Sequence, residues 1–206
     1  MTLGAFCSGY GIWMYITWLP GYLEMQHHVT VAKTGYLASI PLMFAMLGSI
    51  CGGFASDWLV RMGVPIVQAR KIPASLGYVG SSIFTALAAA SGGPAIAIVL
   101  MSLAQFCLWF ALTSKWTLIT AVSPQNYVSS CSSIQNFGSY IGGTVSPFLT
   151  GYVVDQTGSF VLALVIGSLI MLGAALFYYF MVVSPITEAE LEMGPLSIPE
   201  SDVKLA

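Results

Sequence analysis

The stretch LGSICGGFASDWLVRMG, residues 47–63, decides how this chain folds. Its first ten residues are small or apolar and include three glycines, and it ends in Asp57, Arg61 and Gly63. A glycine inside a water-exposed helix costs about 1 kcal/mol relative to alanine. In a lipid bilayer, small residues instead allow two helix backbones to approach closely. The stretch therefore predicts a membrane-embedded helix that packs tightly against a neighbour and ends in charge.

The whole chain has the composition of an integral membrane protein. Of its 206 residues, 57% are hydrophobic and only 7% are charged, whereas a soluble domain usually carries about 25% charged residues. The chain has no basic patch, so we expect no nucleic-acid partner. The four cysteines and the adjacent His27 and His28 lack the spacing of metal ligands. The sequence therefore predicts neither a metal site nor another cofactor.

Six stretches are long and apolar enough to cross a membrane, which takes about 20 residues. Because they lack the period-two alternation of barrel strands, they predict an all-α protein with six transmembrane helices and short loops. A polar tail, residues 186–206, lacks a core-forming pattern and is predicted to be disordered. The predicted helices occupy residues 3–23, 35–56, 73–91, 95–121, 128–153 and 160–183.

Basic residues predict the orientation of the chain in the membrane. The second predicted loop, residues 57–72, contains Arg61, Arg70 and Lys71, and cytoplasmic loops carry an excess of Lys and Arg. We therefore expect a multi-pass protein of the cell (inner or plasma) membrane with both ends of this segment in the cytoplasm. Met1 leads almost directly into an apolar helix, which is unlike a cleaved signal peptide and indicates a chain entered partway through a larger protein.

A glycine motif occurs twice, ninety residues apart. GSICGGFAS at 48–56 and GSYIGGTVS at 138–146 both fit G-S-x-x-G-G-x-x-S. They lie in the second and fifth predicted helices, so the six helices divide into two triplets, about residues 1–91 and 92–185. Because three is an odd number, the second triplet crosses the membrane in the opposite sense. Inverted triplets of this kind are a known construction of secondary transporters.

Several segments carry a resemblance to a known family. GGFASDWLVRMG at 52–63 resembles the loop signature in the C-terminal half of the major facilitator superfamily. The resemblance extends over residues 3–185 and implies the second half of a twelve-helix fold, whose N-terminal six-helix half would be a missing partner. Four further segments are similar to its anion:cation symporter family: YITWLPGYL at 15–23, KTGYLASIP at 33–41, VSPQN at 122–126 and SPFLTGYVVDQTGSF at 146–160.

The resemblance implies secondary active transport of a small organic anion by alternating access, coupled to a cation that we expect to be a proton. Bacterial members carry sugar acids such as galactonate and glucarate, and their proton-carrying carboxylates lie largely in the first half. The six predicted helix cores contain no Asp, Glu or His, which argues against a membrane enzyme. A channel-like or structural membrane subunit without transport of its own is the alternative.

Asp57 and Arg61, at the cytoplasmic end of the second predicted helix, are candidate gating residues. Their i,i+4 spacing allows an ion pair that contributes about 0.2–0.5 kcal/mol when exposed. The resemblance implies that such residues hold one conformation through ion pairs and helix-end contacts. A solvated helix end is the alternative.

Lys115 and its neighbour Trp116 are candidate substrate-binding residues in the fourth predicted helix. Lys115 lies about 12 Å of helix from the cytoplasmic end near Ser123. A buried ammonium group costs at least about 2.5 kcal/mol, so such residues face a cavity or a partner, and this one suits an organic carboxylate. The alternative is snorkelling towards the headgroups. The resemblance implies that Trp116 faces the central cavity, with packing or an interface position as the alternative.

Gln135, Asn136 and Tyr15 complete the candidate substrate site. Amides within an apolar segment need hydrogen-bond partners, either on a neighbouring helix or on a substrate hydroxyl. Family members commonly carry an asparagine in this region, in an N-x-x-G-N-like motif that this chain replaces with QNFGS at 135–139. Tyr15 is predicted to face the cavity from the first helix, which Pro20 is expected to bend.

Overall fold

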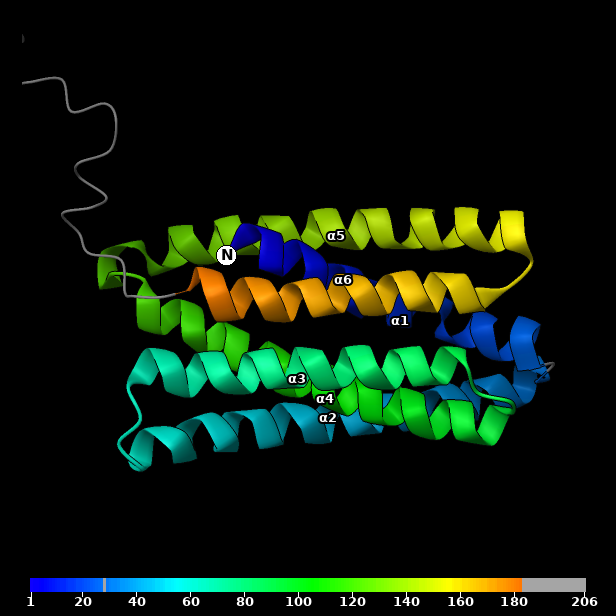
Figure 1. Cartoon of the computed structure of the whole chain (residues 1–206), viewed down its shortest axis with the longest axis horizontal. Helices are drawn as coiled ribbons and strands as arrows, with labels where there is room; N and C mark the ends of the chain where they lie inside the picture. Colours follow the sequence, from blue (N-terminus) through cyan, green and yellow to red (C-terminus); the bar gives the residue numbers. More distant parts are fainter. Residues whose placement is uncertain (28, 183–206) are drawn as a thin grey trace, which may run out of the picture.

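The computed structural model describes residues 1–27 and 29–182, which form six long helices arranged side by side (Figure 1). Consecutive helices run in opposite directions, so the N-terminus and the end of α6 lie towards the same end of the bundle as the α2–α3 connection (Figure 1). The elements are α1 (Thr2–His27), α2 (Val31–Arg61), α3 (Ile66–Ala89), α4 (Pro94–Val122), a short helical turn η1 (Gln125–Tyr127), α5 (Val128–Thr157) and α6 (Phe160–Met181).

The connection between α2 and α3 is shorter than the sequence analysis predicted. Asp57 and Arg61 belong to the end of α2, and Arg70 belongs to the start of α3, so only residues 62–65 join these two helices. The predicted loop over residues 57–72 is therefore wrong in extent. Charged residues at a membrane surface remain solvated while the backbone stays helical, which extends the helices beyond their apolar cores. The predicted tail, residues 186–206, lies outside the described residues.

Within the described residues, four helices are apolar and long enough to cross a membrane: α2, α3, α4 and α6. The other two, α1 and α5, are similarly long but less hydropathic, because α1 contains several tyrosines and tryptophans and α5 is rich in glycine and serine. Four such helices make this a multi-pass membrane protein.

Gly48 and Gly52 bring α2 against α4, backbone to backbone. They lie at the main-chain carbonyls of Phe106 and Phe110, and a Cβ atom at either glycine would overlap these groups. This contact confirms the close helix packing that the first glycine motif predicts. Hydroxyl groups flank the contact, since Ser56 Oγ lies 2.9 Å from Ser114 Oγ, also across α2 and α4.

The second copy of the motif makes a corresponding contact. Gly138 and Gly142 of α5 lie against the main-chain carbonyls of Thr2 and Phe6 of α1, again without room for a Cβ atom. Each motif thus packs on the helix that begins the other half of the chain, α2 on α4 and α5 on α1.

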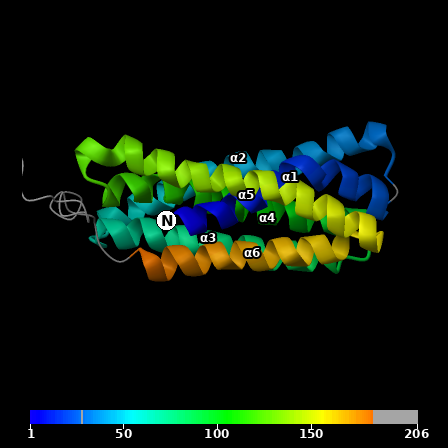
Figure 2. The ribbon, with the colours of Figure 1, turned by 90° about the horizontal axis from the view of Figure 1, so that it is seen from above.

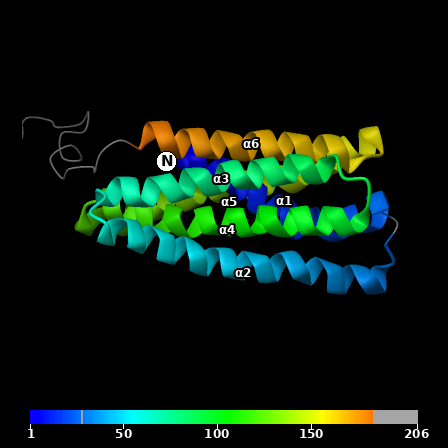
Figure 3. The same ribbon diagram turned by 60° about the horizontal axis from the view of Figure 1, so that its bottom comes forward.

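The remaining helices close the bundle. α3 packs against both α4 and α6, and α1 packs against α6. Figures 2 and 3 show α2 and α6 on opposite sides of the bundle, with α3 and α4 between them. Polar side chains also enter the contacts between helices, and several of them meet around Lys115.

Candidate functional site

Lys115 lies inside the bundle, with 1% of its surface exposed. Its Nζ donates a hydrogen bond to Ser8 Oγ of α1, at 3.3 Å, and lies 5.4 Å from the centre of the Trp116 ring. The Ser8 hydroxyl in turn donates to the Ala5 carbonyl, at 3.0 Å. The side chain does not reach the surface, in contrast to the snorkelling alternative. Among the described residues, Lys115 has no carboxylate partner, so its positive charge is buried without a counter-charge.

Five helices contribute side chains to a polar cluster around this ammonium group. Ser8 lies next to the hydroxyls of Tyr78 and Tyr178, whose rings stack with centroids 5.7 Å apart. Gln135 is buried and donates a hydrogen bond from Nε2 to the Tyr178 hydroxyl, at 2.9 Å. The polar cluster therefore consists of Ser8 (α1), Tyr78 (α3), Lys115 (α4), Gln135 (α5) and Tyr178 (α6).

Part of the hydrogen-bonding capacity of the polar cluster is unused. Gln135 Oε1 is buried and has no hydrogen-bond partner within the described part of the chain, and the Tyr78 hydroxyl has only the Ser8 hydroxyl beside it. An ammonium group has three donors, and the structure gives Lys115 one hydrogen bond. Buried polar groups left unpaired cost about 1–3 kcal/mol each. The polar cluster is therefore equipped to accept water or the polar groups of a ligand.

Trp116 and Asn136 lie next to members of the polar cluster but nearer the surface. Trp116 is 40% exposed, and its ring is adjacent to Lys115 Nζ, so it connects the buried ammonium with the outside of the bundle. Asn136 follows Gln135 on α5 and is partly exposed. Successive helical residues point about 100° apart, which explains why one amide is buried and the other is not.

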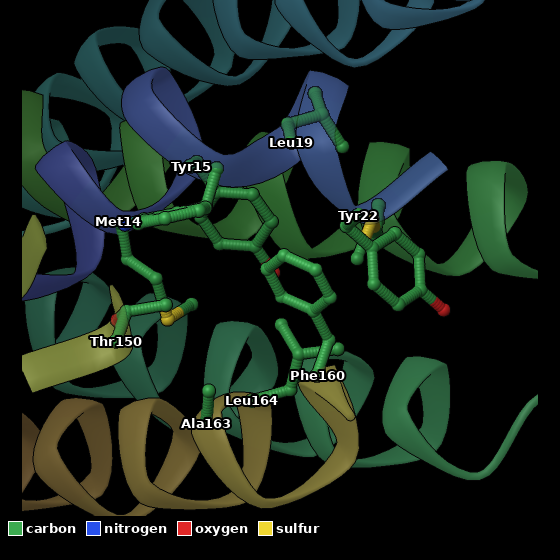
Figure 4. A pocket seen from close by; sticks show the side chains of 10 residues that line it. Met14, Tyr15, Leu19, Tyr22, Thr150, Phe160, Ala163 and Leu164 are labelled. Carbon is green, nitrogen blue, oxygen red and sulfur yellow. The ribbon is translucent and has the colours of Figure 1, made fainter. Parts of the chain in front are cut away.

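Tyr15 lies apart from the polar cluster. Its hydroxyl is 2.6 Å from Thr85 Oγ1 of α3, and its ring lines a small apolar cavity with Met14, Leu19 and Phe160 (Figure 4). The cavity volume is about 10 Å³, which is room for about one water molecule. The structure thus brings Lys115, Trp116, Gln135 and Asn136 into one region and leaves Tyr15 in an apolar one.

The predicted ion pair between Asp57 and Arg61 is wrong. Asp57 Oδ1 instead lies 2.7 Å from Arg70 Nη1 of α3. Arg61 is exposed and forms no ion pair with any residue that the structure describes. The reason is the short connection over residues 62–65, which places the first turns of α3 beside the last turns of α2.

The sequence analysis missed four residues of these sites. The sequence analysis counts Arg70 only as a basic residue of a loop. Arg70 and Asp57 are equally far along the chain from the connection over residues 62–65, and this spacing indicates that they lie opposite each other. Ser8, Tyr78 and Tyr178 carry no such signal, because serine occurs in all six apolar segments of this chain and tyrosine in five of them.

Comparisons with known proteins identify relatives over nearly the whole chain. It is 38% identical over 188 residues to the probable L-galactonate transporter of Escherichia coli K12. The matched region covers 91% of this chain and 42% of the relative. It is 33% identical over 196 residues to the probable galactarate/D-glucarate transporter GarP of the same strain, covering 93% and 44%. A D-galactonate transporter of Escherichia coli O6:H1 is 32% identical over 180 residues, covering 87% and 41%.

The chain thus spans less than half the length of these curated relatives. All three are named as transporters of sugar acids, in agreement with the type of family that the sequence motifs resemble. Residues 1–199 match the Major Facilitator Superfamily. The chain belongs to this superfamily, whose members are transporters and not enzymes.

Proposed function

We propose that this chain is the C-terminal half of a transporter that moves small organic anions, of the sugar-acid type, across the cell membrane. The observation that carries the proposal is Lys115, a buried ammonium group with no carboxylate partner among the described residues. A carboxylate substrate would supply the missing counter-charge. The relatives are named as transporters or probable transporters of galactonate, galactarate or glucarate, and these names support the same class of substrate.

The groups around Lys115 suit the remainder of a sugar acid. Gln135 Oε1 is an unused acceptor for a substrate hydroxyl, and the partly exposed Asn136 amide both donates and accepts. Trp116 offers a flat apolar surface beside the ammonium group. Tyr15 remains a weaker candidate, because its hydroxyl already pairs with Thr85. Binding would require Lys115 to exchange Ser8 for the incoming carboxylate.

Alternating access follows from an arrangement of two inverted triplets, with all six helices crossing the membrane. The proposal is supported by the contacts of the two glycine motifs, since α2 packs on α4 as α5 packs on α1. The N-terminal six-helix half would close the substrate cavity and carry the protonatable carboxylates for a coupling cation, which we expect to be a proton.

The orientation that we propose puts both ends of this segment in the cytoplasm. Arg61, Arg70 and Lys71 lie near the α2–α3 connection, at the end of the bundle that also holds the N-terminus (Figure 1). Cytoplasmic surfaces carry such an excess of basic residues. Gating would then act at this end, through the Asp57–Arg70 pair and through Arg61, which is free to contact the other half.

In the test, the chain is co-expressed with the N-terminal half of the Escherichia coli L-galactonate relative, and transport by the two halves is measured in proteoliposomes. We expect an imposed inward proton gradient to drive galactonate uptake. We expect no uptake of galactose, and no uptake of galactonate by residues 1–206 alone. Lys115→Met should raise the KM for galactonate at least tenfold, whereas Lys33→Met, on exposed α2 surface, should not. An unchanged KM in Lys115→Met would refute the anion site.

A further inference from the structure

A groove runs along the outside of the bundle between α3 and α6. Its volume is about 290 Å³. Leu76 and Phe180 are among the most exposed apolar side chains that line it. A large exposed apolar surface on a membrane protein faces lipid or another apolar partner. The walls of the groove include Ile72, Leu76 and Val79 from α3 and Leu176, Tyr179 and Phe180 from α6.

A basic side chain lies at one end of this groove. Lys71 Nζ is 5.1 Å from the centre of the Tyr179 ring, and it donates a hydrogen bond to the Val182 carbonyl at 3.0 Å. This single hydrogen bond leaves two of the three ammonium donors for another acceptor. The end of the groove near Lys71 is thus suited to negative charge.

Ser75 provides a second polar group in the groove, one helical turn beyond Lys71. It is 7% exposed, and its Oγ is buried without a hydrogen-bond partner among the described residues. Serines elsewhere in the bundle bond back to a carbonyl four residues earlier, as Ser102 of α4 does to Ile98. Ser75 Oγ instead remains available to a ligand in the groove.

We propose that the groove between α3 and α6 binds an anionic phospholipid. The phosphate lies at Lys71 and Ser75, and an acyl chain lies along Leu76 and Leu176. Basic pockets between transmembrane helices on the cytoplasmic side bind anionic headgroups, and apolar walls suit an acyl chain where they do not suit a sugar acid. The site lies outside the bundle, on α3 and α6, so it does not depend on the proposed substrate.

The experiment measures lipid binding to the full chain in detergent, after removal of native lipid, by native mass spectrometry. The probes are dioleoylphosphatidylglycerol and dioleoylphosphatidylcholine. We expect the wild type to bind the phosphatidylglycerol more tightly. Lys71→Met should weaken that binding about fivefold, the effect of one basic residue near the membrane surface, and Lys71→Arg should retain it. Lys33→Met is the matched control, because Lys33 lies at the opposite end of the bundle, and should bind as the wild type does.

Two further variants separate the headgroup from the acyl chain. Ser75→Ala should weaken phosphatidylglycerol binding several-fold, as expected for the loss of one hydrogen bond to a charged group. Leu76→Trp should fill the groove and weaken the binding of both lipids. It keeps the proposal testable if Lys71→Met does not fold. Equal binding of the two lipids by the wild type would overturn the proposal, as would equal loss of binding in the Lys71→Met and Lys33→Met variants.

Discussion

Asp57 of α2 and Arg70 of α3 form an ion pair of 2.7 Å across the helical hairpin that joins them. The two residues are equally far from the connection over residues 62–65, so the antiparallel helices bring them face to face. Arg70 is 15% exposed and Asp57 is 58% exposed. Exposed ion pairs contribute about 0–1 kcal/mol, so this pair fixes the relative position of two helix ends more than it stabilises the fold.

The first prediction concerns this pair. Asp57→Ala should lower the rate of galactonate transport by the co-expressed halves and change the unfolding temperature by no more than a few degrees. Reversing the pair with Asp57→Arg and Arg70→Asp together should restore part of the rate. Asp155→Asn, at an exposed acid of α5, is the control and should transport normally. A wild-type rate in Asp57→Ala would eliminate the gating role.

The second prediction separates binding by Lys115 from a structural role. Lys115→Met removes a desolvated charge that costs at least about 2.5 kcal/mol, so the unliganded chain should unfold at a higher temperature than the wild type. The same variant should lose the stabilisation that galactonate gives to the co-expressed halves. Thermal unfolding in detergent, with and without galactonate, measures both effects. A lower unfolding temperature without ligand would indicate that Lys115 supports the fold.

The third prediction uses two adjacent glycines of α2. Gly52→Ala should destabilise the protein by about 1–3 kcal/mol, the usual cost of overpacking, because its Cβ would collide with the Phe110 carbonyl. Gly53→Ala is the matched control, since a Cβ there would lie 3.7 Å from the Thr113 methyl group, an ordinary contact. Unfolding temperatures of the two variants in the same detergent should differ clearly. Equal values would show that α2 and α4 are not in backbone contact.

The fourth prediction tests the polar cluster. Tyr178→Phe removes the acceptor of the Gln135 Nε2 hydrogen bond and leaves that amide buried, which should cost about 1–3 kcal/mol. Adding Gln135→Met should recover part of the loss, because the unpaired amide is then removed as well. Tyr179→Phe, which removes the hydroxyl of a half-exposed tyrosine, should have little effect. Strictly additive losses in the double variant would show that the two side chains are not coupled.

The sequence predicted those features that depend on local composition. The lengths of the apolar segments predicted the six helices, and Gly48 and Gly52 predicted the close contact of α2 with a neighbouring helix. Helix ends were less accurate, because charged residues such as Arg70 continue a helix beyond its apolar core. The predicted partner of Asp57, Arg61, was wrong, because the i,i+4 rule considers a single helix whereas the observed partner, Arg70, lies on the next helix of the hairpin.

The candidate site was predictable only in part, for a physical reason. Lys115 and Gln135 stand out, because a charge or an amide is rare in an apolar helix. Their partners Ser8 and Tyr178 lie 107 and 43 residues away along the chain. Such contacts depend on how the helices are arranged in space, which no local pattern in one sequence specifies.

The glycine contacts of α5 with α1 also constrain how the chain is made. α1 ends at His27, whereas α5 begins at Val128, about 100 residues later in synthesis. At translation rates of about 5–20 residues per second, α1 waits roughly 5–20 s before α5 is made. In the proposed arrangement of six membrane-spanning helices, its polar side chains, including Ser8, would meanwhile need shelter from lipid by the insertion machinery or by temporary neighbours. We therefore expect α1 to complete its packing in this bundle only after α5 has been made.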